Sequence, residues 1–504
     1  MLPLEQMREF AADAASSLAR ESDLADFEVY CSSSEQLVVR LNYTSDIPCR
    51  GVEEAKSENA DGLALRVVTR RNPHECGWAF EAGELDQAAL RRALERARAN
   101  AIADPHFVGL PSSARASRDK IPHAPTVMMA DGKLLVSAGW DALRSAIDRH
   151  NRYASGGASG GGFILGGDIT VSKERIAVAG PHAPTGCVDQ HAHYRVALTA
   201  FIEEIAAKAS VSRLGTSTYD LRRAASSLGW RAVDSALRLK ASHCPSAGEY
   251  RVLLGPQPVA EILNHIVLPS LTARSFYTAN SAYLGRFGAP VMDRRLSLDD
   301  DPRARHGAVR RHLSCEGIPA RRITLVRNGE LVGLLASFYD ARRLQAARNR
   351  KTKLSVQLAG SNGYRLADSG VRRFDAQIAT SASNVVMRAR HGRALRWLMR
   401  SLDNGIYIGN VWYTYPINGQ AAGDFTCTIS GGSYLIRNGV PEAPIAPNCL
   451  RINANIRDVF EALIATEDET HATTLWGAPQ AYYVPSLAVE RLSLSAITSP
   501  HEGG

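Results

Sequence analysis

The 504-residue sequence has no CxxC pair among its eight cysteines and no apolar run near the roughly 18 residues that span a bilayer. Scattered cysteines predict neither a disulfide framework nor a zinc knuckle. Residues 1–20 carry Glu5, Glu9 and Asp13 in an alanine-rich helical pattern, without the basic start and apolar middle of a secretory signal. We therefore expect a soluble, cytoplasmic protein with reduced cysteines and no membrane contact.

Two common catalytic or binding loops are also missing. The glycine-rich stretch 153–172 lacks the Gly-Lys-Ser/Thr ending of a phosphate-binding loop. No Gly-x-Ser-x-Gly elbow occurs, and no serine or cysteine has a recognisable base partner. The net charge is +8, but the arginines are spread along the chain, and the densest basic cluster, 341–353, has few aromatic neighbours. Nucleic acid is therefore disfavoured as a partner, and a basic-surface binding module remains an alternative function.

What is present predicts a globular α+β protein, with 45% apolar and 22% charged residues. At about 100–200 residues per domain, we expect an N-terminal α+β domain over 1–240 and a β-rich domain over 246–504. The Pro, Ser and Gly of residues 241–250 mark the junction. The first domain is expected to combine helices with a mixed sheet, and the second to contain one central helix. Periodicity predicts helices at 1–23, 84–103, 131–149, 224–240 and 258–276, and strands at 26–42, 168–172, 175–180, 194–202 and 250–255.

Three hairpins are predicted from turn residues between apolar runs. Residues 322–337 surround Asn328-Gly329, and residues 427–442 surround Asn438-Gly439. In the N-terminal half, residues 62–80 form two strand-like runs with a turn expected at Asn72-Pro73.

Taken in chain order, these pieces resemble the TldD/PmbA family of zinc metallopeptidases and peptidase-like subunits. Single motifs of this kind are common, and their ordered occurrence along the chain carries the resemblance. The matching positions are Gly62, Arg66, Val67, Gly77 and Phe80 in the first half, then Asp300, Asp301, Pro302, Glu316, Gly317, Asn328 and Gly329, followed by the segments 360–365, 404–412 and 423–439.

Active members of that family carry a His-Glu-x-x-x-His helix after the strand that corresponds to 250–255. Zinc needs three protein ligands and an open position for water, and a glutamate takes the proton of that water. Aligned on Gly255, the first histidine, the glutamate and the second histidine fall on Asn264, His265 and Pro269. The resemblance therefore implies that this chain has no metal ligand, no catalytic residue and no cofactor of its own.

Other placements of the motif fail as well. A shift by one residue makes His265 the first ligand but leaves Ile266 and Ser270 at the other two positions. Glu261 and His265 share a helical face, yet two ligands without a third make a poor zinc site. Active members add a cysteine ligand in a Cys-Gly setting, which Cys427 lacks. We expect Cys427 to be a small core residue.

The pattern is closer to the PmbA branch, also called TldE, which lacks the zinc ligands. The resemblance then implies a heterodimer in which a TldD-type subunit supplies the zinc and the chemistry, with a homodimer possible. The implied substrate is a peptide, held as an added strand through its main chain.

Two residue clusters support competing interpretations. His191 and His193 are two residues apart, as on one face of a strand, and with Cys187 four residues earlier they form a weak alternative metal site. An autonomous peptidase or other enzyme with a rebuilt active site would use this cluster. The acidic run Asp299 to Asp301 is typical of a solvated turn and could also meet the amino terminus of a peptide.

Overall fold

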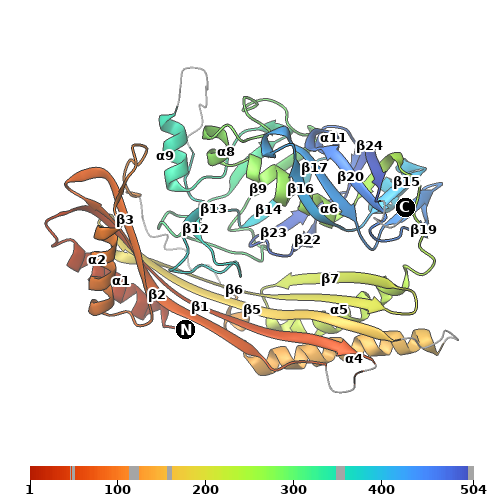
Figure 1. The fold of residues 1–504 in the computed structure, drawn as a ribbon, viewed down its shortest axis with the longest axis horizontal. Coiled ribbons are helices and arrows are strands. Elements are labelled where there is room, and N and C mark those ends of the chain that lie inside the picture. The colour runs from red at the N-terminus through yellow and green to blue at the C-terminus, as the bar shows by residue number, and fades with distance from the viewer. Residues whose placement is uncertain (46, 48–50, 113–123, 156–161, 348–357, 498–504) are drawn as a thin grey trace, which may run out of the picture.

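The computed structural model describes residues 1–45, 47, 51–112, 124–155, 162–347 and 358–497 (Figure 1). The fold is α+β, as predicted, with the N-terminal half forming one long sheet beneath the β-rich C-terminal half. No helix in these ranges is both long and apolar enough to cross a membrane. The basic cluster 341–353 and the glycine-rich stretch 153–172 lie partly outside the described residues.

The N-terminal half forms a seven-stranded sheet in the order β4-β3-β2-β1-β5-β6-β7. Each pairing in it is antiparallel, so the mixed sheet predicted here is wrong. Short turns join β2 to β3, β5 to β6 and β6 to β7, and a hairpin reverses chain direction. The runs 168–172 and 175–180 belong to one strand. The strands are β1 Leu24–Thr44, β2 Lys56–Thr69, β3 Asn72–Ala82, β4 Ile102–Ala103, β5 Phe163–Gly180, β6 Ala183–Ile202 and β7 Ala207–Gly215.

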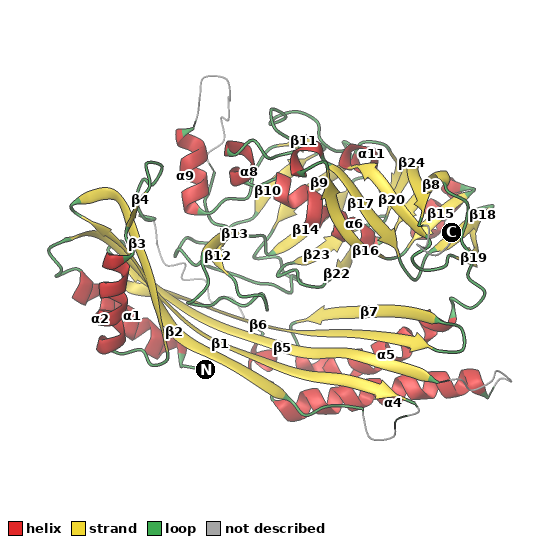
Figure 2. Cartoon of the chain, viewed as in Figure 1, coloured by secondary structure: helices red, strands yellow, loops and turns green. Residues whose placement is uncertain are grey.

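Helices cover one face of this sheet, the face turned away from the C-terminal half in Figure 2. Asp86 and Asp131 cap two of them by accepting hydrogen bonds from the backbone N–H groups of Ala89 and Leu134. The four main helices bury their apolar stripes against the strands, which leaves the opposite sheet face for contacts with the rest of the chain. The helices are α1 Leu4–Leu18, α2 Gln87–Ala99, α3 Pro125–Met128, α4 Gly132–Ala154 and α5 Leu221–Leu237.

Gly77, one of the positions that carry the family resemblance, has a packing reason to be glycine. A Cβ atom at Gly77 would lie 1.8 Å from the carbonyl oxygen of Ala97 in α2. Any larger residue would push α2 off β3. The turn of this hairpin falls at Arg70-Arg71 and not at Asn72-Pro73, because Asn72 already pairs with Thr69.

The C-terminal half contains three further sheets and short helices. A nine-stranded sheet runs β16-β17-β20-β24-β8-β15-β18-β19, with β21 paired to β24, and a six-stranded sheet runs β11-β10-β9-β14-β23-β22. The strands are β8 Gly248–Leu254, β9 Leu296–Asp300, β10 Ile323–Arg327, β11 Glu330–Leu331, β12 Gly363–Arg365, β13 Ile378–Thr380, β14 Asn384–Ala389, β15 Gly405–Ile408, β16 Val411–Ile417, β17 Asp424–Ile429, β18 Tyr434–Arg437, β19 Val440–Pro444, β20 Leu450–Asn455, β21 Leu463–Thr466, β22 His471–Thr473, β23 Ala481–Val484 and β24 Leu487–Ala496. The helices are α6 Pro256–Ile262, α7 Leu268–Ser270, α8 Ala273–Tyr277, α9 Phe338–Ala346, α10 Leu395–Leu402 and α11 Ile456–Phe460.

Both hairpins predicted in this half are confirmed. Asn328 and Gly329 join β10 to β11 with φ angles of 50° and 84°, and Asn438 and Gly439 join β18 to β19 in the same way. These two-residue turns need positive φ at both positions, which Asn-Gly adopts at low cost.

The helix predicted over 258–276 is divided into shorter pieces. Between α6 and α7, residues Leu263–Val267 form one π-helical turn, in which the N–H of Leu268 bonds the carbonyl of Leu263. Proline lacks an N–H and its ring clashes with the carbonyl four residues earlier. Pro269 therefore favours the wider π turn at this point, and α8 starts separately after Leu271. Single π turns within helices frequently occur at functional sites.

Buried ion pairs join the open sheet face to the C-terminal half. Arg372 is fully buried, and its guanidinium lies 2.7 Å from Glu174 of β5 and 2.8 Å from Asp189 of β6. Arg66 of β2 bridges in the same way to Glu28 at 2.6 Å and to Glu316 at 3.3 Å. Removing one partner from such a buried pair is strongly destabilising, so these contacts fix how the two halves meet.

Candidate functional site

A hydrogen-bonded network surrounds Asn264 and His265, two of the helix positions to which the sequence analysis assigns the zinc motif. The side-chain oxygen of Asn264 accepts two hydrogen bonds of 2.6 Å, from Nε2 of Gln480 and from the hydroxyl of Tyr482. Tyr482 lies on β23 and is fully buried. Asn264 is therefore held as an acceptor by two donors from the six-stranded sheet, Tyr482 on β23 and Gln480 directly before it.

The neighbouring polar side chains of the helix are paired with one another. His265 Nε2 lies 3.2 Å from Glu261 Oε2 and 3.1 Å from Asn264 Nδ2. Gln257 donates to Glu261 Oε1 at 3.1 Å and bonds both the N–H and the carbonyl of Val411 on β16. His265 is 41% exposed and Glu261 13% exposed. Glu261 and His265 thus contact each other, as their four-residue spacing on the helix suggested.

The remaining motif positions and the cysteine also have structural partners. Pro269 offers no ligand atom, and the hydroxyl of Ser270 accepts a 2.9 Å hydrogen bond from Gln420. Cys427 is buried in the apolar core beside Glu261, and burial raises the pKa of its thiol well above the usual range. Because the thiolate is the metal-binding form, this environment disfavours Cys427 as a ligand.

A cavity of about 260 Å³ lies beside this network, between the open face of the N-terminal sheet and the C-terminal half. Gln480 lines the cavity and also bonds Asn264, so one side chain connects the two. The sheet contributes Gln36, Thr170, Ser172, His193, Arg195 and Leu214, and the C-terminal half contributes Val309, the segment 368–370 and the segment 474–480.

The structure places Cys187, His191 and His193 on the same face of β6, facing the C-terminal half. The two imidazoles stack with ring centroids 5.3 Å apart, while Cys187 packs in an apolar cluster with Tyr30 and Cys315. Burial lowers the pKa of His193 to about 4, with Glu174 as an opposing influence. The ligand atoms of these three residues do not form one of the close metal-like groups found among the described residues.

A different group of possible metal ligands, which the sequence analysis did not predict, lies between the end of β21 and the start of β22. Atoms of Glu467, Glu469 and His471 lie within 4.8 Å of one another, and His471 Nε2 is 3.1 Å from Glu467 Oε2. Glu467 is buried and also accepts a 3.1 Å hydrogen bond from the N–H of Ser486. The Glu-x-Glu-x-His spacing, in the bent segment that leads from β21 into β22, is the signal that could have indicated it.

The acidic run at the end of β9 is buried, so the prediction of a solvated turn is wrong for Asp299 and Asp300. Asp299 binds Arg322 at 2.9 Å and also contacts Arg388. Asp300 accepts hydrogen bonds of 2.7 Å from Asn362 and 2.8 Å from the N–H of Ser383. Burial raises the pKa of Asp300 from 3.8 to about 7, although both hydrogen bonds oppose the shift.

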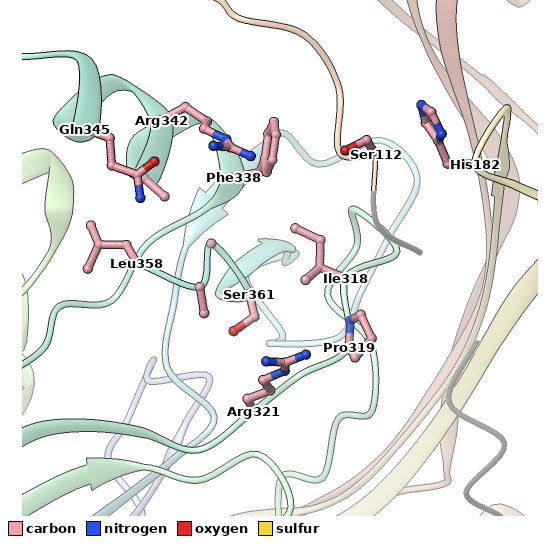
Figure 3. A pocket seen from close by; sticks show the side chains of 13 residues that line it. Ser112, His182, Ile318, Pro319, Arg321, Phe338, Arg342, Gln345, Leu358 and Ser361 are labelled. Atoms are coloured by element: carbon pink, nitrogen blue, oxygen red, sulfur yellow. The ribbon is translucent and has the colours of Figure 1, made fainter. Parts of the chain in front are cut away.

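A second, larger cavity of about 670 Å³ lies between α9 and the segment 358–361 (Figure 3). Arg342 lies over the ring of Phe338 at 5.0 Å, and Arg321 lines the opposite side. No acidic side chain is found among its described lining residues. This cavity is separate from the network around Asn264.

Residues 247–496 match the family model described as the PmbA/TldA metallopeptidase C-terminal domain. The chain belongs to the TldD/PmbA family. No curated protein sequence matches it. The matched range includes β8 and the whole α6–α7 helix, so the network around Asn264 lies inside the matched TldD/PmbA domain.

Solved structures of this TldD/PmbA fold align with nearly the whole chain. TldE from Thermococcus kodakarensis superposes with a TM-score of 0.78, at 16% identity, over 96% of this chain and 100% of that one. A protein described as a modulator of DNA gyrase from Thermotoga maritima gives 0.75 at 16% identity, covering 97% and 99%. A similarly described protein from Bacteroides thetaiotaomicron gives 0.71 at 18%, covering 98% and 99%. At these identities the likeness establishes the fold.

Proposed function

We propose that this chain is the PmbA/TldE-type subunit of a TldD-type metallopeptidase complex that processes or degrades small peptides. The observation that carries the proposal is the Asn264 network. At the three motif positions the chain offers an amide, a single imidazole and a proline, whereas a catalytic zinc site needs three ligands and a general base.

The paired state of these side chains supports a structural role for the helix. Asn264 accepts from Gln480 and Tyr482, and His265 lies against Glu261. Recruiting a metal here would require breaking hydrogen bonds to a fully buried tyrosine, and leaving a buried donor unpaired is costly. The zinc and the water-activating glutamate would then come from a TldD-type partner in a heterodimer.

The chain contributes part of the peptide-holding cavity in this proposal. The cavity next to Gln480 lies between the sheet face and the C-terminal half. The side chains of Gln36, Ser172 and Gln480 line it and could hydrogen-bond the main chain of a bound peptide. A cytoplasmic location fits the free thiols of all seven cysteines in the described part of the chain.

Co-expression with a TldD-type subunit that carries His-Glu-x-x-x-His tests the proposal. We expect a stable hetero-oligomer on gel filtration, peptide cleavage by the complex, and loss of cleavage when the partner's motif glutamate is replaced by glutamine. A chain that elutes alone as a monomer or homodimer at micromolar concentration in the presence of every TldD-type subunit from the same genome would contradict the pairing.

A further inference from the structure

We propose that the cavity lined by Arg195 and His193 binds the carboxylate end of a peptide. This inference rests on the proposed function, because it assigns one end of the peptide substrate to this chain. The cavity is then a terminus-recognition site, which determines how far the peptide extends toward the helix 256–270.

The register of the sheet places the cavity's polar groups in two adjacent rows. Across β1, β5 and β6, Gln36 pairs with Ser172, and Ser172 pairs with His193. In the next row on the same face, Arg195 lies opposite Thr170. Residues directly opposite in an antiparallel sheet point to the same side, so these side chains form one polar floor under the C-terminal half.

Arg195 is a partly buried cation that forms no ion pair within 4 Å with a carboxylate of the described residues. Its Nε atom is buried without a hydrogen-bond partner among the described residues. Burial lowers the pKa of Arg195, and Asp168, the acid that acts on it, lies 3.5 Å from Arg40. The buried Arg372, in contrast, contacts two carboxylates. Desolvating a charge without a partner is costly, and an incoming carboxylate would supply the missing partner.

The neutral groups around Arg195 fit the same ligand. Nδ1 of His193 is buried without a partner. Four charged or titratable groups act on this imidazole, namely Glu174, Arg311, Arg195 and His191, and desolvation keeps it neutral near pH 7. It can therefore act as a hydrogen-bond donor to a ligand oxygen without adding charge. A guanidinium binds a carboxylate through two parallel N–H···O bonds.

The size and position of the cavity indicate a chain end. Its volume, about 260 Å³, is below the roughly 300–1,000 Å³ of sites that enclose a whole drug-sized ligand. Asp368, the acidic residue in its wall, is exposed, and Trp476, also in the wall, is 90% exposed. Gln480 links the cavity to Asn264. A peptide whose carboxylate meets Arg195 would thus lie beside Trp476 and the helix 256–270.

The test compares a fluorescein-labelled alanine–leucine pentapeptide with a free carboxyl terminus and the same peptide as its amide, binding to the full chain and to its complex with a TldD-type subunit. We expect the acid to bind about tenfold or more tightly than the amide. Arg195→Gln should remove this preference. Arg321→Gln, a control in the other cavity shown in Figure 3, should retain it.

A second variant keeps the test decisive if Arg195→Gln unfolds. Thr170→Asp places a carboxylate directly opposite Arg195 and should abolish the acid preference while preserving the fold. Equal binding of acid and amide by the unmodified protein would overturn the inference, as would loss of the preference in Arg321→Gln alone. A complex that cleaves peptides without this preference would refute the inference and leave the proposed function intact. A chain that prefers the acid but never assembles with a TldD-type subunit would support the inference and contradict the proposed function.

Discussion

The side-chain oxygen of Asn264 lies 2.6 Å from the hydroxyl of Tyr482, which joins the α6–α7 helix to β23. Gln480 donates to the same oxygen from the wall of the neighbouring cavity. An acceptor held by two donors thus occupies Asn264, the position at which we predict the first histidine of the zinc motif to be replaced.

His265→Ala is expected to leave peptide cleavage by a reconstituted complex within about twofold of the unmodified rate. His265 is 41% exposed and contacts Glu261 on its own helix, and an exposed pair of this kind contributes little to stability. Steady-state cleavage rates measure the effect, with gel filtration as the control for assembly. A loss by orders of magnitude in a folded, assembled complex would assign His265 a role in the chemistry.

Asn264→Ala is expected to lower the free energy of unfolding by about 1–3 kcal/mol, because it leaves the buried Tyr482 hydroxyl without its acceptor and Gln480 with only the Tyr482 oxygen to bond. Tyr482→Phe removes one donor to Asn264 and one of the two acceptors of Gln480, while Gln480 keeps its bond to Asn264, and it should cost less, about 0.5–1.5 kcal/mol. Chemical denaturation of both variants and of the double variant gives the coupling between them. Strictly additive losses would show that the two side chains do not interact as described.

Arg372→Ala is expected to destabilise the chain by about 3–5 kcal/mol, since Glu174 and Asp189 would remain buried without their cation. Arg373 provides a matched control in the next position. Its partners Glu58 and Asp375 are more exposed, and Arg373→Ala should cost about 0–1 kcal/mol. Equal losses in the two variants, measured by denaturant unfolding, would contradict the burial argument.

Asp300→Asn is expected to make the chain less sensitive to pH between about 4 and 7. The folded state raises the pKa of Asp300 from 3.8 to about 7, so it binds a proton that the unfolded state has released in this range. The unfolding free energy of the unmodified chain therefore falls as pH rises through the window. At 1.36 kcal/mol per pKa unit, the advantage of the variant should grow to the order of 4 kcal/mol above pH 7 and vanish below pH 4. A constant difference across the window would contradict this assignment.

The sequence was sufficient to predict the fold where local chemistry determines it. Asn328-Gly329 predicts its hairpin because both residues accept positive φ. β5 was predicted as two strands because Lys173 and Glu174 interrupt its apolar pattern. In the folded chain Lys173 pairs with Glu35, and Glu174 pairs with Arg372 from the other half. These distant partners stabilise polar residues inside a strand, and no short-range pattern indicates them.

The sequence indicated the helix positions of the candidate site but not the residues that bond them. The spacing from Gly255 predicts Asn264, His265 and Pro269 as the altered motif positions, and this assignment stays a prediction. Gln480 and Tyr482, which bond Asn264, lie 216 and 218 residues further along the chain and belong to no motif. That the buried Nε atom of Arg195 has no hydrogen-bond partner among the described residues likewise becomes apparent only when the sheet register and the covering half are known.

Zinc content and peptide hydrolysis of the purified chain alone test the central claim most directly. The chain is to be loaded with zinc, dialysed, analysed by elemental spectrometry and assayed with an unstructured peptide, beside its complex with a TldD-type subunit. We expect less than 0.1 zinc per isolated chain, on the order of the background set by weak surface sites, no cleavage by the isolated chain, and cleavage by the complex. One zinc per isolated chain with peptide hydrolysis that Asn264→Ala or His265→Ala abolishes would contradict the account.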